Sequence, residues 1–354
     1  MHFLVSRSIP SRCRRAVLLL LMIFLAVSPT AVYATCSYAD GSGALTLQAV
    51  LQGSITVGRD VPVGTELYRT RARSTSNVAV RCDVDSQFNY RYISFPYPKA
   101  SYVDPVYGNN VYLTNVAGVG VVGWAGSNQP MPVGFNSANA GVVTNVRIHD
   151  YYFSLIKIGD VSPGTVTGAS FPLNQYVVGS NNLVVHNGGA VGSLNVVART
   201  CTTPNVDVPM GDHLLNELNG IGSVTSPAAD ASFRLLNCPA FFGRTSIYSN
   251  NGSVSNSPLA ANTISFRIDP TTSVVNAANG VFSLRPGGAT GIGIQLINGS
   301  NAPVALQTTR PSGLVLQPTS MNYTVPLFAR YYQTGEVTTA GAANSSVTVT
   351  LTYL

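Results

Sequence analysis

The clearest alternation of hydrophobic and polar residues lies in residues 344–354, at the end of the chain. Val347, Val349, Leu351 and Tyr353 alternate there with serine and threonine. A period of two places these apolar side chains on one face of a β-strand. Because no residue follows, the strand is expected to have nothing of its own along its far edge, and exposed apolar edge strands usually have a partner. The pattern therefore predicts a strand that another chain completes by strand addition.

Short alternating segments of the same kind recur through the rest of the chain. They are rich in Val, Thr, Ser, Gly and Asn, and turn-forming Asn-Gly pairs stand at 251–252 and 298–299. This composition is typical of short antiparallel strands in β-sandwiches. One helical turn is expected near residues 212–218. The sequence therefore predicts an all-β protein.

Residues 1–34 have the features of a secretory signal peptide. Four arginines within residues 7–15 are followed by an apolar run at 16–27, and Val32-Tyr33-Ala34 offers a cleavage site. The run is shorter than the about 20 residues of a membrane-spanning helix, so a retained anchor is the weaker alternative. Cleavage after Ala34 would leave 320 residues, a length that predicts two domains.

Removal of residues 1–34 lowers both the net charge and the number of cysteines. Without the four arginines of this segment the net charge falls from +6 to +2, which gives no support for nucleic-acid binding. Four cysteines remain, which suits disulfide bonds in an oxidising compartment. Cys36 and Cys82 lie in the first half and Cys201 and Cys238 in the second, so the simplest pairing is one bridge within each half. Without a CxxC motif or clustered histidines, neither a metal nor another cofactor is expected.

The two predicted domains, 35–199 and 200–354, meet between Val197 and Cys201 and differ in composition. The first contains most of the tyrosines and the only tryptophan. Rigid aromatic rings beside arginine suit sugar or protein recognition, although packing in the core is the simpler role for each ring. The candidate receptor-binding residues chosen on this basis are Trp124, Tyr107, Arg71, Arg147 and Tyr176.

Three arginines of the front half recur at every second position. Arg69, Arg71 and Arg73 are therefore predicted to share one strand face. This face is either solvated or a patch that binds an anionic receptor.

Enzymatic roles find little support in the sequence. Residues 118–123 formally match GxGxxG, but the following Trp-Ala-Gly-Ser-Asn-Gln-Pro cannot open the helix that a dinucleotide site needs. Neither GxSxG nor HExxH occurs. Asp83, Asp85 and Asp104 could serve glycoside hydrolysis only if folding paired two of these carboxylates across a cleft. For Asp83 and Asp85, capping of the strand end after Cys82 is the simpler role. The sequence predicts a protein that is not an enzyme.

The second half carries motifs whose order and spacing resemble the pilin domain of chaperone–usher fimbriae. The resemblance covers nearly all of residues 201–354. In chain order the motifs are Cys201-Thr-Thr-Pro-Asn-Val-Asp-Val, Met210-Gly-Asp-His, Phe233-Arg-Leu-Leu-Asn-Cys238, Ile264-Ser-Phe-Arg-Ile, Gly291-Ile-Gly-Ile-Gln-Leu, Tyr323-Thr-Val-Pro-Leu-Phe-Ala-Arg-Tyr-Tyr and the final Val-Thr-Val-Thr-Leu-Thr-Tyr.

This resemblance implies an immunoglobulin-like sandwich that lacks its last strand. A periplasmic chaperone, and later an adjacent fimbrial subunit, would supply that strand against Val347, Val349, Leu351 and Tyr353, and assembly would pass through an outer-membrane usher. Ordinary pilin subunits also carry an N-terminal extension that they donate to a neighbour. Here another domain directly precedes Cys201. The chain is therefore expected to accept a strand but not to donate one, which is the arrangement of a tip adhesin.

The front half resembles the receptor-binding domain of the type 3 fimbrial adhesin family. The residues that carry this likeness are Gly53-Ser-Ile-Thr-Val-Gly-Arg-Asp-Val-Pro-Val-Gly-Thr and Val78-Ala-Val-Arg-Cys-Asp. The resemblance implies a tip adhesin at the cell surface that binds a host glycan or an extracellular-matrix protein. The alternatives are a structural tip or capping subunit without a receptor and, less favoured, a secreted enzyme that acts on glycans.

Overall fold

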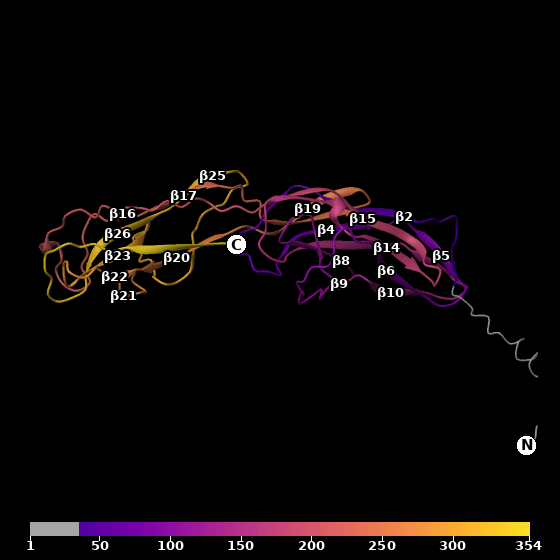
Figure 1. Cartoon of the computed structure of the whole chain (residues 1–354), viewed down its shortest axis with the longest axis horizontal. Coiled ribbons are helices and arrows are strands. Elements are labelled where there is room, and N and C mark those ends of the chain that lie inside the picture. The colour runs from indigo at the N-terminus through magenta and orange to yellow at the C-terminus, as the bar shows by residue number, and fades with distance from the viewer. Residues whose placement is uncertain (1–34) are drawn as a thin grey trace, which may run out of the picture.

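The computed structural model describes residues 35–354, and the predicted signal peptide lies outside the described residues. Figure 1 shows an elongated molecule of two lobes built from β-strands. Within residues 35–354, helical structure is limited to the 3-10 turns η1 (Gly168–Ser170) and η2 (Leu215–Glu217), and no helix is long and apolar enough to cross a membrane. The all-β prediction is confirmed, and η2 lies within the helical turn expected at 212–218.

Three sheets surround the hydrophobic core of the front lobe. The smallest has the order β1 (Cys36–Tyr38), β5 (Val78–Cys82), β11 (Val143–Val146). The second has the order β10 (Val133–Ala138), β6 (Ser86–Ser94), β14 (Leu173–Val178), β15 (Leu183–Val197), β13 (Gly164–Thr167), with β2 (Leu45–Leu51) and β3 (Ser54–Thr56) parallel to β15. The third has the order β19 (Ser253–Ala260), β18 (Arg244–Asn250), β4 (Glu66–Ser74), β12 (His149–Lys157), β8 (Val119–Ala125), β7 (Tyr112–Leu113), with β9 (Gln129–Pro130) beside β8.

The second lobe has its own hydrophobic core, which includes Phe233, Phe266 and Leu296. Its five-stranded sheet has the order β16 (Ala229–Asp230), β26 (Leu327–Gln333), β23 (Ile292–Asn298), β22 (Val281–Ser283), β21 (Val274–Asn276). Two smaller sheets complete it, namely β17 (Phe233–Cys238) with β25 (Met321–Val325), and β24 (Arg310–Pro311), β20 (Ile264–Pro270), β27 (Val347–Tyr353).

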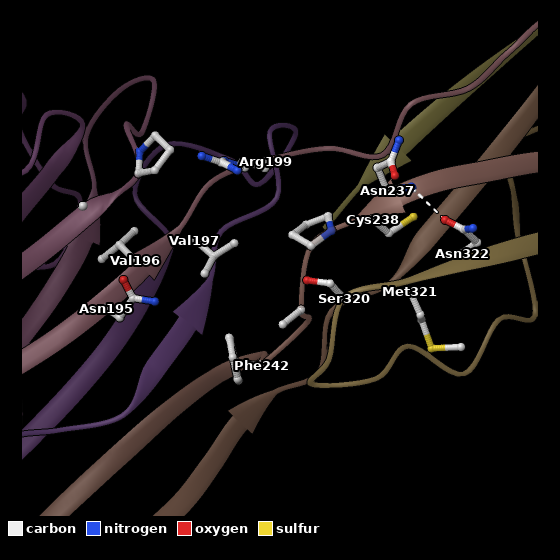
Figure 2. Close-up of a pocket in the computed structure, with 14 residues that line it drawn as sticks. Asn195, Val196, Val197, Arg199, Asn237, Cys238, Phe242, Ser320, Met321 and Asn322 are labelled. Atoms are coloured by element: carbon white, nitrogen blue, oxygen red, sulfur yellow. Dashed lines mark hydrogen bonds between the residues drawn. The ribbon is translucent and has the colours of Figure 1, made fainter.

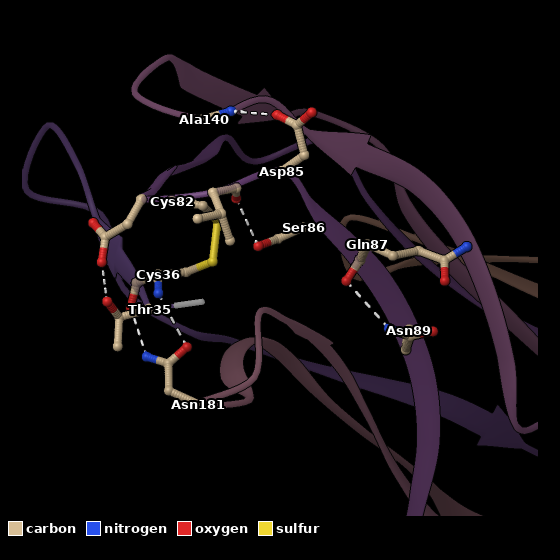
Figure 3. Close-up of a disulfide and its surroundings, with 11 residues drawn as sticks. Thr35, Cys36, Cys82, Asp85, Ser86, Gln87, Asn89, Ala140 and Asn181 are labelled. Atoms are coloured by element: carbon tan, nitrogen blue, oxygen red, sulfur yellow. Dashed lines mark hydrogen bonds between the residues drawn. A yellow bond between two sulfur atoms is a disulfide. The ribbon is translucent and has the colours of Figure 1, made fainter. Parts of the chain in front are cut away.

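Each lobe contains one of the two predicted disulfides. Cys36 is joined to Cys82 in the front lobe and Cys201 to Cys238 in the second, so the predicted pairing within halves is confirmed. Figure 3 shows the first bridge where β1 lies against β5. The side chain of Asn181 accepts from the backbone N–H of Cys36 at 3.1 Å and donates to its carbonyl at 2.7 Å, which ties the β14–β15 turn to this edge.

A hairpin from the second half of the sequence belongs to the front lobe. Strand β18 lies parallel to β4, from Thr245 opposite Tyr68 to Asn250 opposite Arg73, and β19 folds back along it. Asn251 and Gly252 form the turn between them with φ of 47° and 84°, as a two-residue hairpin requires. Ile247 is 1% exposed and packs in the front core. A domain boundary near residue 200 does not anticipate this crossing, and Figure 1 shows β19 in the same lobe as β4.

The front lobe also holds the end of β27. The carboxylate of Asp60 accepts from the backbone N–H of Tyr353 at 2.9 Å, and the N–H of Asp60 donates to the Tyr353 carbonyl at 3.2 Å. Gly58 packs so closely that an added Cβ would lie 2.2 Å from that carbonyl oxygen. Residue 354 therefore lies at the junction of the two lobes, where Figure 1 marks the C-terminus.

Replacement of Asp60 tests this contact. Asp60→Ala removes the acceptor of the Tyr353 N–H, and an unpaired buried donor costs about 1–3 kcal/mol. We expect the free energy of unfolding to fall by that amount and hydrogen exchange at Tyr353 to accelerate, whereas Asp60→Asn keeps an oxygen acceptor and changes both less. Equal exchange at Tyr353 in all three proteins would show that the contact does not hold the strand.

Two histidines lie together inside the front lobe. The Nδ1 atoms of His149 and His186 are 3.4 Å apart, and both side chains are buried. Nε2 of His149 is within 3.0 Å of the carbonyl oxygens of Ser76 and Val146, so it carries the proton and leaves Nδ1 as acceptor. Burial lowers the pKa of His149. Burial also lowers the pKa of His186, to about 3, and the neighbouring His149 adds to this shift.

The lowered histidine pKa values predict a loss of stability in mild acid. Between the ordinary pKa of 6.5 and about 3, the unfolded chain binds a proton that the folded His186 does not. The free energy of unfolding should therefore fall below pH 6.5, by up to about 1.4 kcal/mol per pH unit for each histidine. Chemical unfolding between pH 5 and 7 measures this slope. His186→Phe keeps a ring and should flatten the slope; an unchanged slope would contradict the assignment.

Candidate functional site

A long groove runs along the second lobe and has a volume of about 1000 Å³. One wall is the extended segment 203–210 and the other is the segment 343–349, which leads into β27. The floor is apolar and comes from the core strands of the lobe. Its side chains include Phe233, Ile268, Phe282, Ile294, Leu296 and Leu327.

Backbone groups line both sides of this groove without a strand between them. Strand β27 pairs with β20, from Val347 opposite Pro270 to Tyr353 opposite Ile264, and with no other strand of residues 35–354. Across the groove, residues 203–209 make no backbone-to-backbone hydrogen bond within the part of the chain that the structure describes. An extended segment lying between these two edges could hydrogen-bond to either of them.

The alternation expected at 347–353 is present in β27. Val347, Val349 and Leu351 are half-buried against the core of the second lobe, and Thr348 and Thr350 are exposed. Tyr353 differs because it is 5% exposed and lies at the lobe junction, where Asp60 binds its backbone. Val347 and Val349 line the groove directly, so the apolar face of the strand forms part of its wall.

A second unusual feature is a row of stacked side chains across the third sheet of the front lobe. Tyr248 of β18, Arg71 of β4, Tyr152 of β12 and Trp124 of β8 are successive register partners and share one face. The rings of Trp124 and Tyr152 stack with centroids 4.0 Å apart. The guanidinium of Arg71 lies 5.9 Å from the Tyr152 centroid and 4.8 Å from that of Tyr248, within cation–π range. We refer to these four side chains as the stacked row.

A polar cluster supports the inner end of the stacked row. Glu66 accepts two hydrogen bonds from Arg69, at 2.9 and 2.6 Å, and one from the hydroxyl of Ser154. Ser154 in turn accepts from Nε1 of Trp124 at 2.9 Å. The hydrogen bond to Glu66 raises the pKa of Arg69, so this guanidinium stays charged and paired.

The structure brings together three of the five receptor candidates. Arg71 and Trp124 belong to the stacked row, and the ring of Tyr107 lies over Trp124 with centroids 6.5 Å apart. Trp124 and Tyr107 are only 4% and 7% exposed, because the segment around Tyr107 covers this end of the row. Arg147 is exposed elsewhere, and Tyr176 is buried at the Tyr90 ring, where burial raises its pKa to about 12.

The arginine face predicted for β4 is present. Tyr248 is the member of the stacked row that could not be predicted from the sequence. Arg69, Arg71 and Arg73 are half-buried on β4 and alternate with buried Thr70 and Ala72. No local signal identifies Tyr248, because its place beside Arg71 depends on the crossing of the hairpin.

A cleft of about 780 Å³ separates the lobes (Figure 2). The end of β15 and Arg199 line one side, and Asn237, Met321 and Asn322 line the other. The backbone N–H of Asn237 donates to the side chain of Asn322 at 2.8 Å. Most lining side chains are exposed, including Phe242 and Met321 at 40% and 42%, so the cleft is an open joint between the lobes.

Both halves of the chain are similar to known fimbrial proteins. Residues 189–354 match the family model described as fimbrial protein. More particularly, the chain is 24% identical over 341 residues to a fimbria adhesin protein of Klebsiella pneumoniae, which covers 93% of this chain and 97% of the relative. The resemblance to fimbrial adhesins that the motifs predict is confirmed.

The solved structures found to be similar to parts or most of the chain include two adhesins. One is the CupB6 tip adhesin of Pseudomonas aeruginosa, with 16% identity, a TM-score of 0.35, and coverage of 90% of this chain and 94% of that one. The other is the receptor-binding domain of a plasmid-born adhesin of Klebsiella pneumoniae, with 15% identity, a TM-score of 0.35, and coverage of 48% and 99%.

Proposed function

We propose that this protein is a fimbrial tip adhesin that is anchored through its second lobe and binds a receptor through its front lobe. The observation that carries the proposal is the groove between segment 203–210 and β27, in a lobe whose residues match the fimbrial protein model. The family match and the adhesin relative support adhesion and a location on surface fimbriae. Nothing in these relatives suggests catalysis.

In this proposal the second lobe is an immunoglobulin-like fold that lacks one strand. A donated strand would lie between the two edges of the groove and place alternate side chains on the floor formed by Phe282 and Leu296. A periplasmic chaperone would fill the groove first, an outer-membrane usher would deliver the subunit, and the neighbouring subunit would then replace the chaperone strand. In this proposal residues 35–199 together with the hairpin of β18 and β19 bind the receptor, and the rest of residues 200–354 anchors the subunit.

The proposed receptor for the front lobe is a host glycan or an extracellular-matrix protein. The stacked row supports a binding role because aromatic and arginine side chains carry much of the energy of known interfaces. A structural tip subunit without a receptor is the second candidate function, since buried Trp124 and Tyr107 also stabilise the lobe.

Adhesion of fimbriated cells tests the proposal. Cells that lack this chain should lose adhesion, and the full chain should restore it. The purified full chain, with a peptide in its groove, should bind at least one component of a combined glycan and matrix-protein array. A folded chain that restores normal fimbriae without adhesion, and that binds nothing on the array, would indicate the structural subunit instead.

A further inference from the structure

The outer end of the stacked row is open, and residues from both halves of the sequence form it. Arg71 and Tyr152 come from the front half, and Tyr248 with Ser255 comes from the crossing hairpin. All four share one face of the sheet, because each is the register partner of the next. Tyr248, Arg71 and Tyr152 are half-buried and Ser255 is exposed, in contrast to buried Trp124 at the other end.

We propose that this open end, centred on Arg71, binds a carboxylate or sulfate group of an acidic saccharide. The inference rests on the proposed function, for which it specifies the class of receptor and the site.

Arg71 is the arginine of the β4 face that has, in the described part of the chain, neither an ion pair nor a carboxylate residue as its register partner. Arg69 is paired with Glu66, and Arg73 has Asp150 as its register partner on β12. Arg71 lies between two tyrosines and takes part in no ion pair of residues 35–354. Its Nη2 donates to Asn250 at 2.7 Å, and its buried Nε has no hydrogen-bond partner among the described residues. A planar guanidinium held in this way is preorganised for a carboxylate or sulfate.

The phenol groups beside Arg71 favour the same kind of ligand. Both rings present their faces to the guanidinium, so their edges and hydroxyl groups are left for contact with a ligand. Ring edges carry partial positive charge and phenol hydroxyls donate hydrogen bonds. An anionic group at Arg71 would therefore meet further donors at Tyr152 and Tyr248.

The surface around Arg71 favours a saccharide over a protein segment. Ser253, Ser255 and Ser257 follow one another on the same face of β19, and all three are exposed. Exposed hydroxyl and amide groups can exchange hydrogen bonds with a polyhydroxyl ligand. A peptide would instead be expected to need pockets for its apolar anchors, and neither the groove of the second lobe nor the cleft between the lobes includes Arg71 or Tyr248.

Binding of the full chain to three immobilised polysaccharides tests the site. Heparin provides sulfates, polygalacturonate provides carboxylates, and dextran is neutral. We expect binding to heparin or polygalacturonate, weakened by added salt, and none to dextran. Arg71→Gln should weaken that binding about tenfold or more, whereas Arg234→Gln, which removes an exposed arginine of the second lobe, should not.

A charge placed on β19 separates binding from folding. Ser255→Asp puts a carboxylate beside Tyr248 on the proposed binding face and should repel the ligand. Asn256→Asp puts the same charge on the same exposed strand but on the opposite face, and should leave binding unchanged. Both proteins should unfold at the temperature of the unsubstituted chain.

Three outcomes would overturn the inference. The first is equal binding by Ser255→Asp and Asn256→Asp. The second is equal binding by Arg71→Gln and the unsubstituted chain. The third is that the protein mediates adhesion or captures a matrix protein but binds neither acidic polysaccharide. In that case the adhesin function would hold, and its receptor would be of another class. Loss of the adhesin function itself would appear separately, as fimbriated cells that do not adhere at all.

Discussion

Residues 35–199 produced alone are expected to be unstable and to self-associate, although they contain the whole front half of the sequence. Without β18 and β19, the nine-residue strand β4 becomes an edge with unpaired backbone groups, and such edges recruit other chains. The front core also loses Ile247, which is 1% exposed. Truncation of a buried isoleucine to alanine costs about 2–5 kcal/mol by itself, and loss of the whole strand should cost more.

The measurement compares fragment 35–199 with the full chain by chemical unfolding and by sedimentation over a range of concentrations. In the full chain, Ile247→Ala should lower the free energy of unfolding of the front lobe, whereas Val254→Ala should have little effect because Val254 of the same hairpin is 41% exposed. A peptide of residues 244–260 added to the fragment should reduce its self-association. A monomeric fragment as stable as the front lobe of the full chain would show that the hairpin is dispensable.

The hairpin also marks where prediction from the sequence stops. Its turn could be predicted, because Asn251-Gly252 supplies the two positive φ values of a tight hairpin. The partner of β18 could not, because a period of two specifies which face is apolar but not which distant strand lies alongside. Asn250 and Arg73 pair across 177 positions of sequence, and nothing local to either strand encodes that choice.

In the candidate sites, too, the features set by local sequence could be predicted and those set by distant contacts could not. The alternation at 347–353 and the arginine face of β4 follow from local sequence, and both are present in the structure. The burial of Trp124 depends on the segment around Tyr107, which folds over it from a loop. Composition alone cannot separate a ring that packs in this way from one that meets a receptor, so the open part of the row became recognisable only once Tyr248 was placed.

A peptide that fills the groove of the second lobe is expected to stabilise that lobe by several kcal/mol. Each apolar side chain that moves from water onto the groove floor contributes about 1.5–3 kcal/mol before the cost of ordering the peptide. The peptide backbone can also pair with β27 and with segment 203–209, neither of which has a strand partner on the groove side. A net gain of about 5 kcal/mol would raise the unfolding temperature by about 10–20 °C for a lobe of this size.

The measurement is thermal unfolding of the full chain with a nine-residue peptide of alternating valine and threonine, and with a peptide of equal composition in which the alternation is broken. Val349→Asp should abolish the stabilisation, because a donated strand would bury an unpaired carboxylate against the groove wall. Thr350→Asp should retain it, since Thr350 is exposed on the other face of β27. Two results would mean that the groove does not accept a strand: equal stabilisation by the two peptides, or equal stabilisation of the two variants by the alternating peptide. The anchoring half of the proposed function would then fail, whereas the receptor surface of the front lobe is tested separately.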